Sequence, residues 1–142
     1  MKTNGKQMKT QLLKTLDNSR NYTLAVAEAM PDNFYESRPA DTEWSFRELI
    51  NHIAYGIQWW QENYIRQVET AWEPPSAKDD KKQTIVYLRQ AYDALKNILN
   101  KETMNEEKIQ GFHATADHIT HHRGQAVVYL RFKGIEPPEY IY

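Results

Sequence analysis

The amino-acid sequence predicts an all-α protein built as a bundle of four helices. Glycine and proline, five and six in number, divide the chain into four long segments rich in helix-forming residues. Within each segment, apolar residues recur every three or four positions, which is the period of an amphipathic helix. No segment shows the alternation of apolar and polar residues that is typical of strands between hairpin turns. Four such helices can bury their apolar faces against one another.

The first helix is expected over residues 6–30. Pro31 ends it, because a proline disfavours helical geometry at the residue before it. The apolar positions that follow the helical period are Leu12, Leu13, Leu16, Tyr22, Leu24, Val26 and Ala27.

The second helix is expected over residues 45–66. Ser45 and Glu48 have the spacing of a capping box, in which each side chain accepts a hydrogen bond from the backbone of the other residue. The connection before it, residues 31–44, is long for a simple helix hairpin. We expect this connection to cross the end of the bundle or to form one wall of a site. The apolar stripe of the helix consists of Phe46, Leu49, Ile50, Ile53, Ile57, Trp60 and Tyr64.

The third and fourth helices are expected over residues 80–100 and 114–133. Gly134 has the position of a glycine that follows a helix C-terminus, and Pro137 comes soon after it. The charged runs at residues 78–82 and 102–108 are interpreted as solvated ends and loops.

Length and composition predict one domain over residues 1–142 and exclude several classes of protein. The chain has no cysteine, which excludes disulfides and thiolate chemistry of its own. A formal net charge of −1 without a basic run argues against a nucleic-acid partner. The chain has no run of about 20 apolar residues, which is the length that a membrane-spanning helix needs. Residues 1–14 have no apolar stretch typical of a secretory signal, so a cytoplasmic location is expected.

The histidines are the residues most suited to chemistry, because four of the five lie within residues 113–122. His118 and His122 are four positions apart, so a helix would place them on one face within reach of one metal ion. The glutamate that follows the first histidine in zinc peptidases of this spacing is absent, since Ile119 stands there. Pairs that include His121 are also possible metal ligands, and the apolar side of the helix decides between the pairs. His122 lies on this side and His118 borders it. The side is marked by Ile119, Ala126, Tyr129 and Leu130. We therefore expect His118 and His122 to point into the bundle and His121 to lie at its rim.

His52 is a third candidate ligand, on the apolar face of the second helix. Gly56 stands one turn later, which leaves room for a metal, a water or a substrate or else permits close helix packing. Three histidines from two facing helices would form a neutral site with an open position for water or substrate. Zinc, nickel, iron and copper all accept imidazole ligands. From spacing alone, the alternative of structural histidines stays open.

Two stretches of the chain resemble the signatures of the DinB (damage-inducible) family, which includes the YfiT-like proteins. One is His118-Ile-Thr-His-His-Arg-Gly-Gln125, followed by Tyr129-Leu-Arg131 and Gly134-Ile-Glu-Pro-Pro138. The other is Trp44-Ser-Phe-Arg-Glu-Leu-Ile-Asn-His52. They occur in the order expected for the family, and the resemblance covers essentially the whole chain.

The resemblance implies a four-helix bundle of DinB/YfiT-like type with one long crossover connection, often as a homodimer. It also implies a divalent metal, zinc, nickel or iron, bound by His52, His118 and His122. Some members carry a further histidine one turn before the paired ligands, where this chain has Ala114, with His113 one position out of phase. The family name suggests a stress response.

Three functions remain open from the sequence. By resemblance, the chain is a metal-dependent transferase that activates a low-molecular-weight thiol such as bacillithiol or mycothiol for attack on a small-molecule substrate. The alternatives are a metal-dependent hydrolase and a non-catalytic, metal-stabilised bundle or partner-binding module. The reactive group would be a metal-bound water or thiol, because the possible bases Glu62 and Asp117 are rotated away from the site.

Several further residues are predicted to surround the site. Gln125 is expected to hydrogen-bond a ligand or a water near the metal, and Trp59 to contact a bound cofactor or to form a pocket wall. Trp44, Trp60 and Tyr129 are expected in the core or in pocket walls. Arg123 is predicted to form a salt bridge or dimer contact, and Gly124 to allow close approach of a neighbouring helix or subunit. The roles of His113 and His121 stay unassigned.

Overall fold

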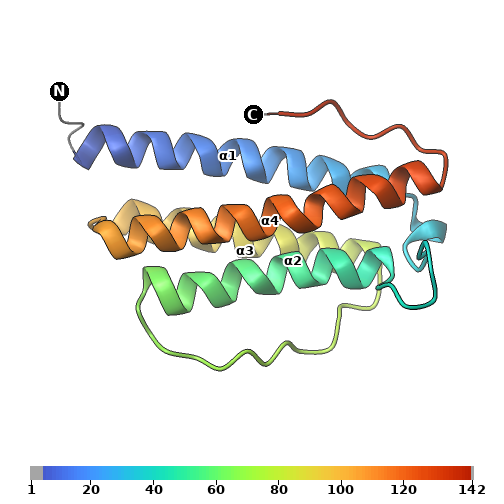
Figure 1. The fold of residues 1–142 in the computed structure, drawn as a ribbon, viewed down its shortest axis with the longest axis horizontal. Helices are drawn as coiled ribbons and strands as arrows, with labels where there is room; N and C mark the ends of the chain where they lie inside the picture. The colour runs from blue at the N-terminus through green and yellow to red at the C-terminus, as the bar shows by residue number, and fades with distance from the viewer. Residues whose placement is uncertain (1–4, 142) are drawn as a thin grey trace.

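The computed structural model describes residues 5–141 and contains four α-helices and no strand within that range (Figure 1). The helices are α1 (Gly5–Ala29), α2 (Phe46–Trp60), α3 (Lys81–Lys101) and α4 (Glu106–Phe132). A 3₁₀ turn, η1 (Asp32–Phe34), follows α1, and a π-helical turn, η2 (Gln61–Ile65), extends α2. The all-α prediction is confirmed. The two ends of the predicted domain, residues 1–4 and 142, lie outside the described residues.

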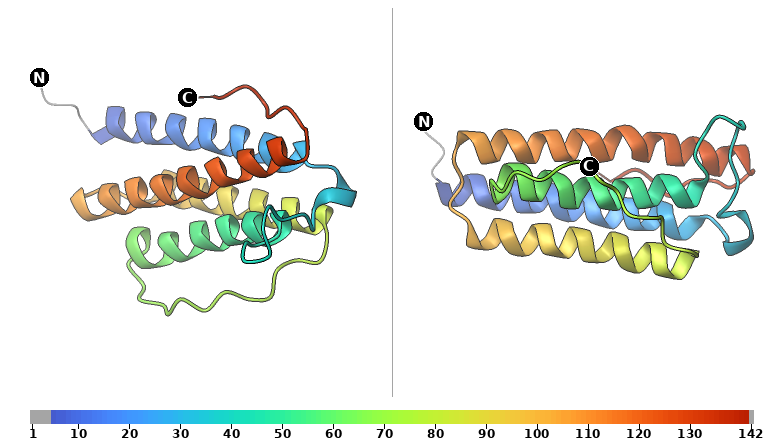
Figure 2. Two further views of the ribbon diagram at one scale, coloured as in Figure 1. Left: turned by 45° about the vertical axis from the view of Figure 1, so that its right-hand side comes forward. Right: turned by 90° about the horizontal axis from the view of Figure 1, so that it is seen from below.

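The helices form a square bundle in which α1 packs on α3 and α4, and α2 packs on the same two helices. Helices α1 and α2 therefore lie diagonally opposite each other, and residues 30–45 cross one end of the bundle to join them (Figure 1). Helices α2 and α3 run in the same direction, so their connection must return along the whole length of α2 (Figures 1 and 2). This connection, rather than the one before α2, is the long crossover. None of the described helices is long and apolar enough to span a membrane.

Side-chain caps fix where three of the helices begin. The capping box at α2 is present, with Glu48 N donating to Ser45 Oγ (3.1 Å) and Ser45 N donating to Glu48 Oε1 (3.0 Å). Asp80 Oδ1 accepts from Gln83 N at 2.8 Å and caps α3. Each cap satisfies a backbone N–H that the helix itself leaves unpaired.

The fourth helix begins at Glu106, eight residues before the predicted start at residue 114. Asn105 caps it by accepting from Lys108 N at 2.9 Å, and the acidic Glu106 favours the first turn. Glycines are expected to separate the helical segments, but Gly111 lies inside α4, where a Cβ would clash with the Cβ of Tyr64. The charged run 102–108 is therefore partly the first turn of α4 rather than a loop.

The buried faces of α2 and α4 determine which side chains meet at their shared edge. Leu49, Ile53 and Ile57 of α2 are fully buried, as are Ile119 and Ala126 of α4. His52 of α2 and His118 and His122 of α4 lie beside these core positions and are half-buried. They therefore face the seam between α2 and α4 at the boundary of core and solvent.

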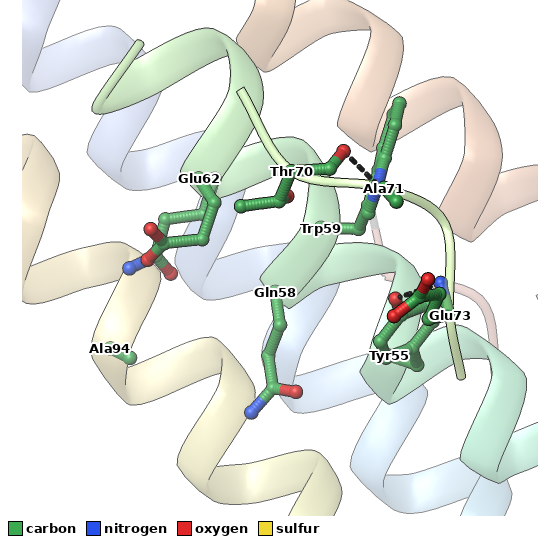
Figure 3. A pocket seen from close by; sticks show the side chains of 9 residues that line it. Tyr55, Gln58, Trp59, Glu62, Thr70, Ala71, Glu73 and Ala94 are labelled. Atoms are coloured by element: carbon green, nitrogen blue, oxygen red, sulfur yellow. Dashed lines mark hydrogen bonds between the residues drawn. The ribbon is translucent and has the colours of Figure 1, made fainter. Parts of the chain in front are cut away.

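Residues 66–79, called the strap below, lie along the outer face of α2 (Figure 2, right). Side chains spaced four residues apart on α2 and its extension η2 hold the strap at each turn. Asn51 Oδ1 accepts from Lys78 N, Tyr55 Oη from Glu73 N, and Asn63 Oδ1 from Thr70 N, all at 2.8–2.9 Å. Trp59 Nε1 donates to Thr70 O at 3.2 Å (Figure 3). The strap is thus fixed to α2 by side chains that the helical period brings to one face.

Replacing Asn51 by leucine should destabilise the fold by about 1–3 kcal/mol, because the buried Thr84 hydroxyl loses a donor and Lys78 N its acceptor. Asn63→Leu is the matched control, since Asn63 makes the same three kinds of bond in a more exposed setting. Urea denaturation of both variants measures the difference. Equal losses at the two positions would contradict the role given to burial.

Candidate metal centre

Three histidine side chains from two helices converge on one point. His52 Nε2 of α2 lies 3.1 Å from His118 Nε2 and 3.0 Å from His122 Nε2, both on α4. One ligand atom from each of the three lies within 4.8 Å of the others. The structure thus brings together the three residues that the sequence singled out, here called the three-histidine cluster.

The donor set and its spacing fit a divalent metal ion. Bonds of about 2.0–2.1 Å in tetrahedral geometry place two nitrogen ligands roughly 3.3 Å apart. The two Nε2 separations of His52 are close to that value. The Nε2 of a neutral imidazole carries either one hydrogen or one lone pair, so His52 Nε2 can form a direct, linear hydrogen bond with only one of its two neighbours. A cation between them would be attracted by all three lone pairs.

Burial keeps the cluster neutral. Desolvation, followed by the proximity of the other two histidines, lowers the pKa of His52 to about 4. Desolvation, followed by repulsion from His122 and His121, lowers the pKa of His118 to about 4. The pKa of His122 is also lowered, mainly by desolvation, although its hydrogen bond to Gln125 opposes the shift. Imidazoles in this state offer lone pairs to a metal at neutral pH.

The Nδ1 atoms of His122 and His118 differ in their hydrogen-bond partners. His122 Nδ1 lies 2.8 Å from Gln125 Oε1, and this bond requires a proton on Nδ1 and so leaves Nε2 free to bind a metal. The glutamine therefore forms its hydrogen bond with His122, one of the three candidate ligands. His118 Nδ1 is buried and has no hydrogen-bond partner among the described residues.

Gly56 creates the space for His118. A Cβ at this position would clash with His118 Cε1 and lie 2.6 Å from His118 Nδ1. The space beside Gly56 is thus filled by a ligand ring, and it is not room for a metal, a water or a substrate. Of the two alternatives from the sequence, close packing is correct, with an imidazole rather than a whole helix as the neighbour.

Two tryptophan rings pack against the three-histidine cluster. The Trp44 ring, from the connection before α2, lies 4.5 Å from His52 and 5.9 Å from His122. The Trp72 ring, from the strap, lies 5.6 Å from His52 and 6.4 Å from His118. The expectation that the 31–44 connection shapes a wall is met by Trp44. Sequence reasoning missed Trp72, although a tryptophan in a polar loop just before Pro74 is an unusual feature.

One cavity beside the strap reaches the cluster, and a larger one beside it does not. A groove of about 190 Å³ is lined by His52, Trp44 and Tyr55 among others. The other, of about 520 Å³, is lined by Trp59, Glu62 and Glu73 and by none of the three histidines (Figure 3). Trp72 separates Trp59 from the cluster, with its ring 5.4 Å from that of Trp59. Trp59 is therefore a pocket wall, but not beside the candidate metal ligands.

The other residues highlighted in the sequence lie outside the cluster. His113 and His121 are exposed on α4, as expected for the rim position of His121. Arg123 is buried, donates to Thr23 Oγ1 (3.2 Å), and forms no salt bridge with a carboxylate of residues 5–141. Its guanidinium lies 4.8 Å from the ring centre of Tyr22 instead. A Cβ at Gly124 would meet no atom within 4 Å, so no helix of this chain approaches it.

A helical bundle with a three-histidine cluster on the seam of two helices defines the class of this protein, and comparison with known proteins identifies its family. The chain matches the DinB family over residues 1–142, and it belongs to that family. The DinB-like protein YjoA of Bacillus subtilis is similar in structure, with a TM-score of 0.73 and 22% identity over 92% of this chain and 98% of that one. A DinB-like protein of Bacillus cereus ATCC 10987 gives a TM-score of 0.78 and 17% identity over 92% and 95%. No curated protein sequence matches the chain.

Replacing Gly56 by alanine should displace the His118 ring and weaken metal binding. The affinity for the metal should fall by at least as much as the roughly 10- to 100-fold decrease that follows removal of a hydrogen-bond partner of a metal ligand. Gly124→Ala is the matched control, because its methyl meets nothing and should stabilise α4 by up to about 1 kcal/mol. Calorimetric titration with Zn²⁺ and thermal unfolding measure both effects. Unchanged affinity in Gly56→Ala would contradict the assigned contact.

Acid should destabilise the metal-free protein through the cluster. Unfolded histidines take up protons near pH 6.5, whereas folded His52 and His118 resist protonation down to about pH 4. The unfolded chain then binds more protons in this window, so the free energy of unfolding falls as the pH is lowered from about 6.5 to about 4. Urea denaturation in chelator at several pH values should show a shallower fall for His52→Gln and an unchanged one for the exposed His113→Gln. Parallel curves for all three proteins would refute this.

Proposed function

We propose that the chain is a metal-dependent transferase that joins a low-molecular-weight thiol to an electrophilic small molecule. The observation that carries the proposal is the convergence of three neutral imidazole nitrogens beneath two partly exposed indoles. A cluster that served stability alone would be expected to be enclosed by the core. Here the imidazoles are only half-buried, and a groove reaches His52.

The residues have distinct tasks in this proposal. His52, His118 and His122 bind the metal, and Gln125 holds the proton on His122 Nδ1 so that Nε2 stays a ligand. A divalent ion in such a site supplies Lewis acidity, which lowers the pKa of an incoming thiol and favours its thiolate near neutral pH. Trp44 and Trp72 restrict the approach to the cluster.

The transfer is a substitution at carbon. The thiol sulfur forms the new bond to the electrophilic carbon while the bond from that carbon to its leaving group breaks, and the leaving group takes the bonding electrons. No carboxylate belongs to the cluster within the described chain, so the thiol proton passes to solvent. The chain's contribution is thus to gather the reactants and hold neutral ligands in place.

The proposal is tested by metal analysis together with a conjugation assay. The wild-type chain should hold one divalent ion, and with it should conjugate bacillithiol, cysteine or coenzyme A to chlorodinitrobenzene. The His52→Ala/His122→Ala double variant should lose both the ion and the activity, because two of three ligands are gone. His113→Ala, an exposed histidine outside the cluster, should keep both.

Two results would overturn the proposed function. Bound metal with no conjugation of any thiol, and a large loss of thermal stability on chelation, would indicate a metal-stabilised bundle without catalysis. Metal-dependent turnover of esters or amides in the absence of a thiol would indicate a hydrolase.

A further inference from the structure

The strap places a large apolar side chain next to the cluster in a way that core packing does not explain. Trp72 is 42% exposed, yet its ring is wedged edge-on between Tyr55 (4.8 Å) and Trp59 (5.4 Å). The residues on both sides of it are tied to α2, since Thr70 O accepts from Trp59 and Glu73 N donates to Tyr55. The indole is thus held in a fixed position against Tyr55 and His52 while part of its ring stays exposed.

Trp44 is a second indole held beside the cluster. It is 44% exposed, and its backbone oxygen accepts from Tyr129 Oη at 2.7 Å, which fixes this point of the connection. Trp44 contacts His52 and His122, whereas Trp72 contacts His52 and His118. Each indole thus contacts His52 together with a different histidine of α4.

The groove that begins at His52 has the size of one ring. Its volume is about 190 Å³, and a dry protein cavity of about 150 Å³ holds a benzene molecule. Its apolar walls come from Trp44, Tyr55, Pro75 and Tyr87. Trp72 packs on Tyr55 and His52, both of which line the groove, and so supports that end of it.

The charges around the groove disfavour an anion. Among residues 5–141, its walls contain no lysine or arginine. Their one carboxylate, Glu48, already accepts hydrogen bonds from Ser45 N and from Arg38. The nearest cation on the strap, Lys78, lies over the ring of Tyr87 and does not line the groove. An anionic group placed there would lose its hydration without gaining a partner and would be repelled by Glu48.

We propose that this groove binds an uncharged, single-ring organic group, which Trp44 contacts directly and which Trp72 selects indirectly, by holding Tyr55 and His52 in place. The inference rests on the proposed function in one respect, namely that the bound group is the electrophile of the transfer. The thiol must then reach the cluster from another side, because the common carboxylate-bearing thiols do not suit these walls. The selection of substrates lies in two loop residues, outside the helices that hold the metal ligands.

Binding alone tests the groove, without a thiol. Nitrobenzyl alcohol is the neutral probe, and nitrobenzoate is its anionic partner of similar size. Calorimetric titration of the metal-free protein, in which no zinc ion can bind the carboxylate of nitrobenzoate, should show the alcohol binding at least about tenfold more tightly than nitrobenzoate. Trp72→Ala and Trp44→Ala should each weaken the alcohol about tenfold, and Trp72→Phe should restore most of the affinity. Val68→Ala should bind as the wild type does, because this exposed strap residue neither lines the groove nor forms a ring contact with a residue that lines it, as Trp72 does.

The outcomes separate this inference from the proposed function. Equal affinity for the two probes, or unchanged affinity in both tryptophan variants with circular dichroism like the wild type, would overturn the inference. Selective binding of the alcohol without any thiol conjugation would support the groove and count against the proposed transfer. Conjugation whose KM for chlorodinitrobenzene is the same in Trp72→Ala, Trp44→Ala and wild type would support the transfer and overturn the groove.

Discussion

The close contact between α2 and α4 at Gly56 is the constraint on which the candidate metal centre depends. The His118 ring occupies the place of a side chain on α2, which brings its Nε2 to 3.1 Å from that of His52. Any larger residue at position 56 would move the ring and open the cluster. A glycine inside a helix lowers helix stability by about 1 kcal/mol relative to alanine. That loss is offset by the close approach of two helices and by the geometry it gives to three imidazoles.

The direction of the helices has a second consequence for the site. Because α2 and α3 run in the same direction, no short turn can join them, and the chain must return along α2. In this protein the return segment is fixed to α2 and η2 by side chains at four-residue intervals, from Asn51 to Asn63. The topological requirement for a crossover thus supplies a wall for the cluster. Trp72 reaches the histidines only because the strap follows this path.

The three histidines also illustrate a balance between folding and binding. Grouping neutral imidazoles at the edge of the core lowers the pKa of each, since the charged form would be desolvated and would repel its neighbours. The same desolvation leaves the lone pairs free of competing protons at neutral pH. A feature that weakens the metal-free fold in acid therefore prepares it for a cation. Arg123 is also buried, but its guanidinium is surrounded by two aromatic rings and a hydroxyl group within the described chain instead of by other ionisable groups.

The sequence by itself determined the helical class, three of the four helix starts to within a residue or so, and the three histidines, because helical periodicity and caps are local properties. It missed the start of α4, since glycines are expected to separate the helical segments and Gly111 lies inside this helix against Tyr64. It also left open what lies beside Gly56 and gave Trp72 no role. Those features depend on which helices become neighbours and on the path of a loop. Such contacts join residues far apart in the chain, here Gly56 with His118 and Trp72 with His52, so only the tertiary structure could decide them.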